Sequence, residues 1–558
     1  MSNAYDQNDG LPTHAGRLTR PESTYTNAPV LFGGGVPAND LWAIIAAATN
    51  GDVATIKTLA DKNPDLVTAN LDYDQPLHFS VRGNHVEAVR ILLDRGANML
   101  TESRLNGINQ SLDWAKDRGN QEIYDLLDED RRIKFNYSPE AKQVSDAIRK
   151  YCVDDVRSIL EGDKSLAIAS DETGNQPIHW AVLTGQMAII DLLLSYGVDV
   201  DTRRFDGARP LDLIGGDYWY GHRDDAEKVD APTQKALIAG YLVARGAVYD
   251  LPAAARFGDL GRIRELLAAD PSLVHDALTY VSWGVGAPLG YAAEQGREDI
   301  VKILLEYGAD PNMREGNIAP RGSALYNAVG GRYKELVKTL LEHGADPNAV
   351  VESCGNVIGR AKDEIRELIL SYGAYEDPDH GYSRFSDACK LGDTAAVREM
   401  IEEFPKLGRN QGELESAACA GQKEVVTVFM DMNPDLWQQV SIHRGEPELL
   451  RWMLNQGMNP NMMDWKGETP IHRAARRDEP GSLHVLLECG GRTDMIEGFD
   501  ESTPLGLAAR EGHDTTAHIL LDEGADPNLA GADWARPLAW AQRREHWEIV
   551  NLLKENGV

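Results

Sequence analysis

The segment Gly308-Ala309-Asp310-Pro311-Asn312 decides the fold, because the same five residues return at 344–348 and again at 524–528. Looser copies stand at 96–98, 197–199 and 457–461, and a last glycine is Gly557. A second signature, Pro followed by an aliphatic residue and His, precedes several copies, at 76–78, 177–179 and 470–472. Self-similarity at a fixed period indicates a repeat array. We therefore expect one long array rather than several unrelated domains.

Each copy predicts a pair of short helices. In the copy 177–197, Pro177 supplies the fixed φ of a helix start, and Gly197 accepts the positive φ of a helix end. Apolar residues recur at helical spacing on both helices: Ile178, Ala181 and Val182, then Ile189, Ile190, Leu193 and Leu194. Two short helices cannot bury these faces alone, so neighbouring copies must stack.

The Pro-Leu-His start and the Gly-Ala-Asp-Pro-Asn end, which recur roughly every 33 residues, resemble ankyrin repeats. The resemblance extends from Asp40 to Val558, with about sixteen copies, several of them degenerate. It implies an all-α solenoid of stacked helix pairs with short β-hairpin tips, preceded by an extended N-terminal arm. It also implies that His78, His179 and His472 brace neighbouring turns.

Four copies lack the Pro-Leu-His start and begin near residues 41, 141, 251 and 382. We interpret each as the first repeat of a block, and the block junctions near 135 and 250 as the places where the array opens first. The predicted division is an arm at 1–39 and blocks at 40–134, 135–250 with an insertion at 215–231, 251–381 and 382–558.

The net charge of −32, from 56 basic and 88 acidic residues, opposes binding to phosphate backbones and anionic lipids. We expect no nucleic-acid partner and no membrane partner, since no apolar run is long enough to cross a bilayer. The five cysteines are scattered and form no CxxC pair, which favours a reduced cytoplasmic protein without a metal. No cofactor is expected.

Aromatic residues occupy the second tip position of four repeats: Phe205, Trp283, Trp465 and Phe499. In the ankyrin family the tips and the last residues of the first helices line a concave groove that contacts partners. Exposed aromatics there are typical of binding anchors. The alternative is that adjacent tips pack on one another.

The insertion at 215–231 interrupts the sixth copy and can fold over the groove as a lid. It combines aromatic, titratable and charged side chains: Tyr218, Trp219, Tyr220, His222, Arg223 and Asp224. One imidazole beside two carboxylates is a poor metal site, so no metal is predicted. The alternative is a surface loop that shields helix ends.

Arginines cluster at the ends of the first helices in the last three repeats: Arg473, Arg476, Arg477, Arg510, Arg543 and Arg544. In an acidic chain they would focus a positive potential on a carboxylate-rich ligand. The alternative is that they pair with Asp478, Glu511 and Glu545.

The leading hypothesis is an interaction protein that binds a protein partner in its concave groove. The rival is a lyase or hydrolase acting on an acidic saccharide or another anionic small molecule. Its acid/base residues would be Tyr220, His222 and Asp224, and its binding residues Trp219, Trp283, Arg314 and Arg321. A deep convergent pocket would favour the enzyme, and an open groove would favour the scaffold.

Overall fold

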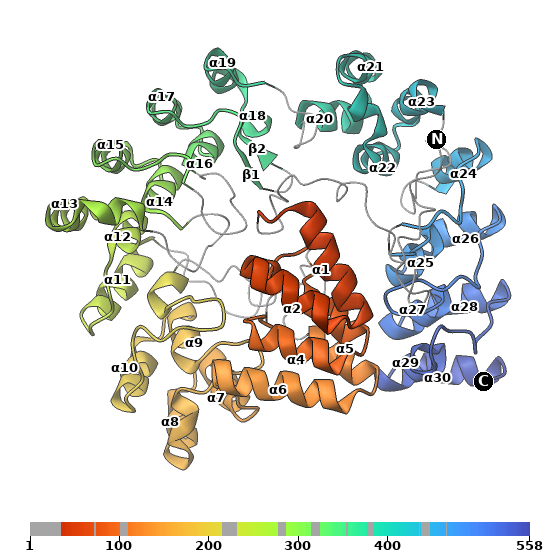
Figure 1. Cartoon of the computed structure of the whole chain (residues 1–558), viewed down its shortest axis with the longest axis horizontal. Coiled ribbons are helices and arrows are strands. Elements are labelled where there is room, and N and C mark those ends of the chain that lie inside the picture. Colours follow the sequence, from red (N-terminus) through yellow and green to blue (C-terminus); the bar gives the residue numbers. More distant parts are fainter. Residues whose placement is uncertain are drawn as a thin grey trace.

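The computed structural model describes residues 35–71, 74–100, 110–214, 232–276, 286–313, 324–352, 355–375, 383–434, 436, 447–464 and 466–558. Within them the chain is an all-α array of short helix pairs, as predicted (Figure 1). The one described sheet is a short antiparallel pair, β1 (Val350–Glu352) and β2 (Gly355–Asn356). Elsewhere in the described residues the tips are held by turns instead of paired strands.

The first half of the array runs through α1 (Ala38–Asn50), α2 (Val53–Lys62), α3 (Pro76–Arg82), α4 (Val86–Asp94), α5 (Gln110–Asp117), α6 (Gln121–Phe135), α7 (Ala141–Arg149), α8 (Val153–Gly162), α9 (Pro177–Leu183), α10 (Met187–Ser195), α11 (Pro232–Val243), α12 (Leu251–Phe257), α13 (Leu260–Ala269), α14 (Pro288–Glu294) and α15 (Glu298–Glu306). We call α1–α6, residues 35–135, the N-terminal block.

The second half runs through α16 (Ala324–Gly330), α17 (Lys334–Glu342), α18 (Val357–Arg360), α19 (Asp363–Ser371), α20 (Ser383–Leu391), α21 (Thr394–Glu403), α22 (Gln411–Cys419), α23 (Lys423–Met432), α24 (Pro447–Asn455), α25 (Pro470–Arg476), α26 (Pro480–Glu488), α27 (Pro504–Glu511), α28 (Asp514–Asp522), α29 (Pro537–Arg543) and α30 (Trp547–Glu555). We call residues 466–558, with α25–α30, the C-terminal repeats.

The four copies without the Pro-Leu-His start share one local feature. After the second helix of each, the chain makes a 3₁₀ turn, at Pro64–Val67, Lys164–Ala167, Pro271–His275 and Pro405–Arg409. In three of them an Asn or Asp side chain accepts a backbone N–H two residues on, as at Asn63 and Asp270. Two further 3₁₀ turns are Pro210–Leu213 and Asp533–Ala535.

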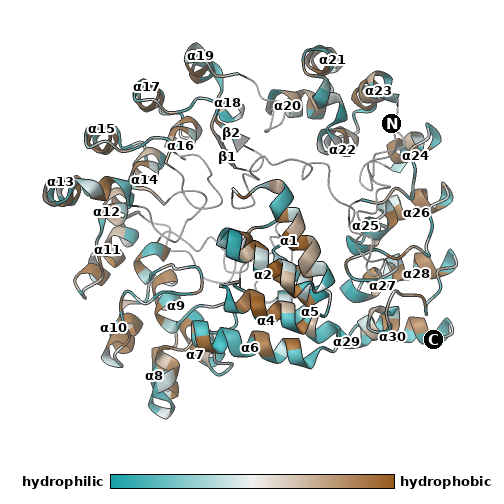
Figure 2. Cartoon of the chain, in the orientation of Figure 1, coloured by the Kyte–Doolittle hydropathy of each residue, from teal (hydrophilic) through white to brown (hydrophobic). Residues whose placement is uncertain are grey.

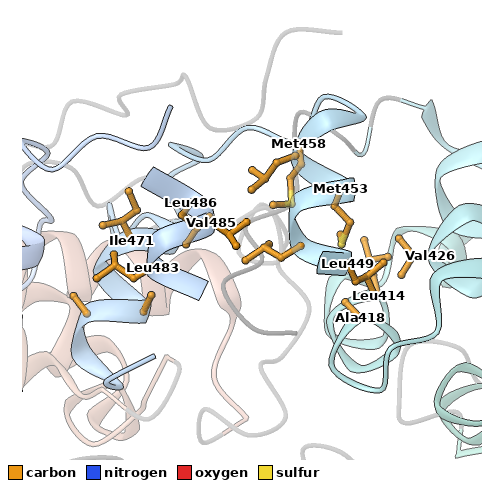
Figure 3. Packing of buried hydrophobic residues seen from close by; sticks show 14 of the residues in the cluster. Leu414, Ala418, Val426, Leu449, Met453, Met458, Ile471, Leu483, Val485 and Leu486 are labelled. Atoms are coloured by element: carbon orange, nitrogen blue, oxygen red, sulfur yellow. The ribbon is translucent and has the colours of Figure 1, made fainter. Parts of the chain in front are cut away.

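The core consists of four clusters of buried apolar residues, spread over 36–127, 141–253, 251–369 and 385–553. Apolar and polar residues alternate around the helices (Figure 2), so each pair buries its apolar face against the next. Figure 3 shows Leu449 and Met453 of α24 lying against Val426 of the preceding pair. The predicted division into blocks stays a prediction.

The array curves into a ring, and the N-terminal block lies inside that ring (Figure 1). The N-terminal block meets the C-terminal repeats there, and we call this the contact between the ends of the chain. In it Arg544, directly after α29, pairs with Asp117 at the end of α5 at 2.9 Å. The first cluster also contains Phe205 and Phe499, two tip residues from later repeats. The N-terminal block therefore packs on repeats far along the chain as well as on its neighbour.

The histidines of the Pro-Leu-His motifs cap the starts of their own helices, and His472 also reaches a neighbouring turn, as expected of all three. The Nδ1 atoms of His78, His179 and His472 each accept the backbone N–H three residues earlier, at 3.1 to 3.2 Å. The Nε2 atom of His472 donates to the Met495 carbonyl oxygen at 3.0 Å. Acceptance by Nδ1 requires a neutral ring, and donation from Nε2 assigns its proton to Nε2.

Glycines between paired helices accept side chains of the next repeat. Gly512 has a φ of +81°, and a Cβ there would lie 2.7 Å from Cε1 of His546. His546 donates from Nε2 to the Arg510 carbonyl oxygen at 3.1 Å, which satisfies an open helix end. Gly524 has a φ of +82° with nothing near its Cβ position.

This pair of glycines provides a matched test of the repeat junction. Both Gly512→Ala and Gly524→Ala should cost about 1 kcal/mol for the left-handed conformation. Gly512→Ala should cost about 1 to 2 kcal/mol more, because the new methyl group displaces His546 and its hydrogen bond. Urea unfolding followed by circular dichroism measures both, and equal losses would contradict the role of His546.

The stability of the protein should depend on the ionisation of His472. Burial lowers the pKa of this histidine from 6.5 to about 4. Between pH 6.5 and 4 the unfolded chain therefore binds a proton that the folded protein does not, so stability falls as the pH is lowered. The loss should be on the order of 3 kcal/mol across this window.

Urea unfolding of the wild type and His472→Gln at pH 7 and pH 4.5 tests this prediction. The variant should be less stable at pH 7 but should lose less stability on acidification. His518→Gln, which changes an exposed histidine of α28, is the control and should behave as the wild type. Parallel curves for all three proteins would show that His472 is not responsible.

Candidate functional site

Most residues of the predicted lid site lie outside the described residues. These are the insertion residues Tyr218, Trp219, Tyr220, His222, Arg223 and Asp224, and the predicted binding residues Trp283, Arg314 and Arg321. The tip residue Trp465 also lies outside the described residues. The site residues that are described are Phe205, Phe499 and the six arginines at the ends of α25, α27 and α29. Phe499, Arg543 and Arg544 contact the N-terminal block. Phe205 contacts the same block from another repeat.

The expectation that Phe205 and Phe499 are exposed is wrong, since each side chain is 7% exposed. Phe205 covers Gly174 of the preceding tip, as the alternative of packed tips requires. Its carbonyl oxygen also accepts from Asn98 Nδ2 of the N-terminal block at 3.2 Å. The ring closure brings the N-terminal block onto these tips, and this closure buries both rings.

Phe499 is the centre of the contact between the ends of the chain. Its ring lies 3.5 Å from the guanidinium carbon of Arg82, whose other side faces Trp114 at 3.7 Å. Phe79 meets Phe499 edge to face, with ring centroids 6.1 Å apart. Lys466 Nζ lies 4.6 Å from the Phe499 ring and 3.6 Å from the carboxylate of Asp74. The Arg82 side chain is thus stacked between aromatic rings of both ends of the chain.

Arg118 makes the second contact of this kind. Its Nη2 atom donates to the Phe499 carbonyl oxygen at 2.9 Å, and its Nε atom donates to the Arg82 carbonyl oxygen at 3.1 Å. The guanidinium carbon lies 4.1 Å from the ring of Trp534. Arg118 therefore links the end of α5 to two successive tips of the C-terminal repeats.

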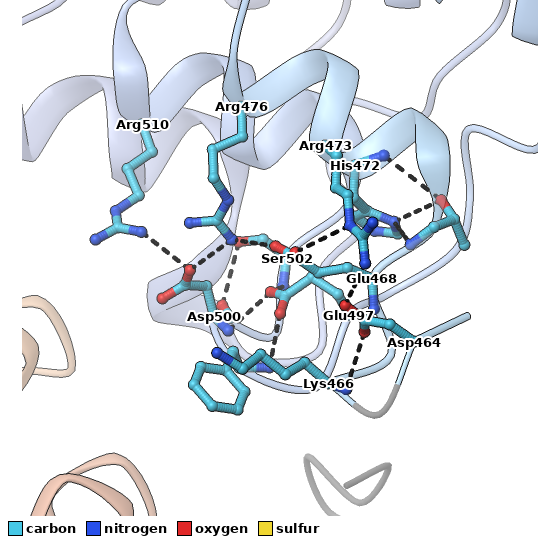
Figure 4. A network of polar contacts seen from close by, with 12 residues as sticks. Asp464, Lys466, Glu468, His472, Arg473, Arg476, Glu497, Asp500, Ser502 and Arg510 are labelled. Carbon is cyan, nitrogen blue, oxygen red and sulfur yellow. Dashed lines mark hydrogen bonds and ion pairs between the residues drawn. The ribbon is translucent and has the colours of Figure 1, made fainter. Parts of the chain in front are cut away.

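The predicted arginine cluster is largely neutralised by carboxylates. Figure 4 shows Arg476 between Glu468 at 2.7 Å and Asp500 at 3.1 Å, and Arg510 on the same Asp500 at 2.9 Å. Arg473 pairs with Asp464 at 2.7 Å. The expectation of an unpaired positive groove is therefore wrong for these arginines, because each tip carries carboxylates toward the helix ends beside it.

The remaining arginines of the cluster differ in their surroundings. Arg543 and Arg544 face Asp117 of the N-terminal block, at 3.8 and 2.9 Å. Arg477 is exposed at the end of α25. The sequence offered pairing with Asp478, Glu511 and Glu545 as the alternative. Of these three carboxylates, all within the described residues, Glu511 forms an ion pair with one of the arginines, 3.7 Å from Arg510. A binding role for the six arginines stays a prediction.

Buried charges shape the tip that carries Phe499. The carboxylate of Glu497 accepts the backbone N–H groups of Phe499, Asp500 and Ser502 at 2.6, 2.7 and 3.2 Å, and so fixes the turn. Burial and the neighbouring Asp500 carboxylate raise the pKa of Glu497 above its usual range. Although burial opposes it, attraction by Arg510 and Arg476 lowers the pKa of Asp500, which stays ionised.

The N-terminal side of the contact carries opposite charge. Burial lowers the pKa of Arg82 to about 10, with attraction by Asp74 and Asp500 opposing the shift. Arg82 is therefore protonated at neutral pH. Around Phe499, the contact therefore joins the cationic Arg82 of the N-terminal block to the Asp500 carboxylate and aromatic rings of the C-terminal repeats. At its edges the charges are reversed, because Asp74 and Asp117 of the block face Lys466, Arg543 and Arg544.

Sequence reasoning missed Arg82, Trp114, Asp117, Arg118 and Trp534. Arg82 ends α3 and Arg118 follows α5, the same position in a repeat that drew attention to the C-terminal arginines. That equivalence was the available signal. Nothing local indicated their partner, because Arg118 and Phe499 are 381 positions apart.

Within the described part of the chain, no group of three or more His, Cys, Asp or Glu side chains could hold a metal ion. No helix among the same residues is long and apolar enough to cross a membrane.

Comparison with known proteins identifies the repeats. A model of three ankyrin repeats matches residues 35–137, 251–350 and 436–531, and a single-repeat model matches 173–204. These matches do not establish the number of repeats, so the count of sixteen stays a prediction.

Relatives match the chain over short segments. A putative ankyrin repeat protein of fowlpox virus, FPV022, is 26% identical over 137 residues, 24% of this chain and 23% of its own length. The ankyrin repeat domain-containing protein SAT10 of Stachybotrys chartarum is 30% identical over 183 residues, 30% of this chain and 9% of that protein. Palmitoyltransferase ZDHHC17 of Danio rerio is 37% identical over 67 residues, 12% of this chain and 11% of that protein.

This chain thus spans less than a quarter of the length of each of these relatives. The family models, in contrast, match more than half of the chain, in the regions where the structure stacks helix pairs. The chain belongs to the ankyrin-repeat family.

Proposed function

We propose that this chain is a scaffold that binds a protein partner on the inner surface of its C-terminal repeats. Ankyrin repeats indicate a role in protein–protein interaction. The observation that carries the more specific proposal is that this surface already holds a folded element of protein, the N-terminal block. A surface that can bind one polypeptide element in this way has the chemistry needed for another.

The make-up of this contact supports the proposal. Aromatic and arginine side chains, which dominate the energetics of protein interfaces, lie at its centre: Phe499, Trp534, Arg82 and Arg118. Ion pairs lie around them, at Asp117 with Arg544 and at Asp74 with Lys466. This arrangement of an aromatic centre with charged surroundings is typical of specific interfaces.

The alternative of an enzyme acting on an acidic saccharide rests on the 215–231 insertion with Trp283, Arg314 and Arg321. All of these lie outside the described residues. No observation on the described residues favours a reaction.

A photoreactive phenylalanine analogue at position 477 tests the scaffold function. Arg477 is exposed at the inner end of α25, whereas His484 is exposed on α26 of the same repeat. The full-length chain labelled at 477 should crosslink a discrete protein in an extract of the source cells, and the chain labelled at 484 should not. Mass spectrometry identifies the crosslinked peptide.

Crosslinking at 477 should fall as salt is raised, because charged groups surround this surface and salt screens them. The same products from positions 477 and 484, or none from 477 at any salt concentration, would contradict the proposal.

A further inference from the structure

The contact between the ends of the chain has two places for a guanidinium group. In the first, Arg82 lies between Phe499 at 3.5 Å and Trp114 at 3.7 Å. In the second, Arg118 lies 4.1 Å from the Trp534 ring and donates to the Phe499 carbonyl oxygen. The flat guanidinium stacks on aromatic faces and donates within its plane, and a lysine ammonium does not reproduce this geometry.

The surface that receives these two arginines presents an ionised carboxylate, that of Asp500. Asp500 is 2% exposed, and both Arg82 and Arg118 stabilise its ionised form. The same carboxylate is held from behind by Arg476 and Arg510, two residues of the C-terminal repeats themselves. The Asp500 carboxylate thus has counter-charges within the C-terminal repeats in addition to those of the N-terminal block.

The N-terminal block fills this surface incompletely. Within the described residues, the buried Nε and Nη1 atoms of Arg82 and the Nη1 atom of Arg118 have no hydrogen-bond acceptor. Asp500 Oδ1 likewise has no donor there. Buried donors and acceptors left unmatched cost free energy, so the self-contact is weaker than the surface permits.

We propose that the tips of the C-terminal repeats form an arginine-binding surface, occupied in the closed ring by Arg82 and Arg118. An arginine-bearing segment of a protein partner binds there by displacing the N-terminal block. This inference rests on the proposed scaffold function and names the chemistry of the partner. Because the surface is covered in the closed ring, the apparent affinity for such a segment is reduced by the fraction of open molecules.

The test measures binding of a fluorescein-labelled peptide with four arginines separated by Gly-Ser pairs. A second peptide, which we call the lysine twin, has lysine in place of each arginine. The lysine twin reports the general attraction of cations to an acidic chain. In the full-length protein, Arg82→Ala/Arg118→Ala vacates the surface. The matched control is Arg90→Ala/Arg95→Ala, which removes two partly exposed arginines of the same block.

The vacated variant should bind the arginine peptide about tenfold more tightly than the wild type, since the internal competitor is gone. The lysine twin should change by less than about twofold, because it cannot stack in the same way. The control should match the wild type.

Adding Phe499→Ala/Trp534→Ala to the vacated variant should remove the gain in affinity for the arginine peptide. An equal gain for the lysine twin, a gain that survives without the aromatics, or no gain would each overturn the proposal.

A second variant that should open the contact is needed in case removal of the buried Arg82 causes misfolding. Asp117→Arg places a cation against Arg543 and Arg544 and leaves both stacked arginines intact. Hydrogen exchange at residues 110–118 and 497–503 should rise in both opening variants while the helical circular dichroism is kept. Unchanged exchange in a folded Asp117→Arg protein would show that this contact does not hold the ring closed.

The outcome is separable from that of the proposed function. Crosslinking at position 477 detects a protein partner whatever its side chains. A crosslinked partner together with equal binding of the arginine and lysine peptides would overturn the arginine surface and leave the scaffold function standing. Arginine-selective binding without any crosslinked protein would overturn the scaffold function and leave the selectivity of the surface for arginine standing.

Discussion

The whole structure depends on one constraint, that a pair of two- or three-turn helices cannot bury its apolar face alone. Each pair must therefore stack on the next, and most of the stabilising contacts are between neighbours in sequence. The short polar contacts follow the same rule. His546 reaches the Arg510 carbonyl oxygen of the preceding repeat, as His85 reaches that of Thr49. These contacts satisfy helix ends that would otherwise lack partners.

The contact between the ends of the chain is the exception to this nearest-neighbour rule. The ion pair of Asp117 with Arg544 joins positions 427 residues apart. In a linear array a change at one repeat is felt mainly by its neighbours, whereas closure couples the N-terminal block to the last repeats directly. A ligand that opens this contact changes the surroundings of both sides together, which is how an array of repeats can respond as a unit.

The sequence is sufficient for the local structure and insufficient for the closure. The recurrence of Pro-Leu-His and Gly-Ala-Asp-Pro-Asn predicts the helix pairs, and the roles of His78, His179 and His472 follow from position in the repeat. The burial of Phe499 depends instead on the sum of many small rotations between repeats, which no single repeat encodes. An aromatic residue at a tip looks the same in sequence whether it faces solvent or a distant block.

The arginine cluster of the C-terminal repeats shows the same limit of prediction from sequence. Arg476 and Arg510 were recognised from their position, but their pairing with Asp500 depends on how the next tip folds, through the three backbone N–H groups that Glu497 accepts. A pattern of like charges in sequence therefore predicts where a charged surface lies better than it predicts its net sign. Carboxylates that neutralise it arrive from loops between the helices.

The two sides of the contact are not equivalent when it opens. Asp500 keeps Arg476 and Arg510 as counter-charges, so its ionised form remains stabilised within the C-terminal repeats. Arg82 loses its contact with the Phe499 ring and the electrostatic attraction of Asp500, but its guanidinium becomes hydrated, which stabilises the charge. The receiving surface thus remains organised in the open ring, while the N-terminal block releases its buried donors. Ring opening is therefore compatible with a fixed binding surface and requires rearrangement mainly on the side that leaves.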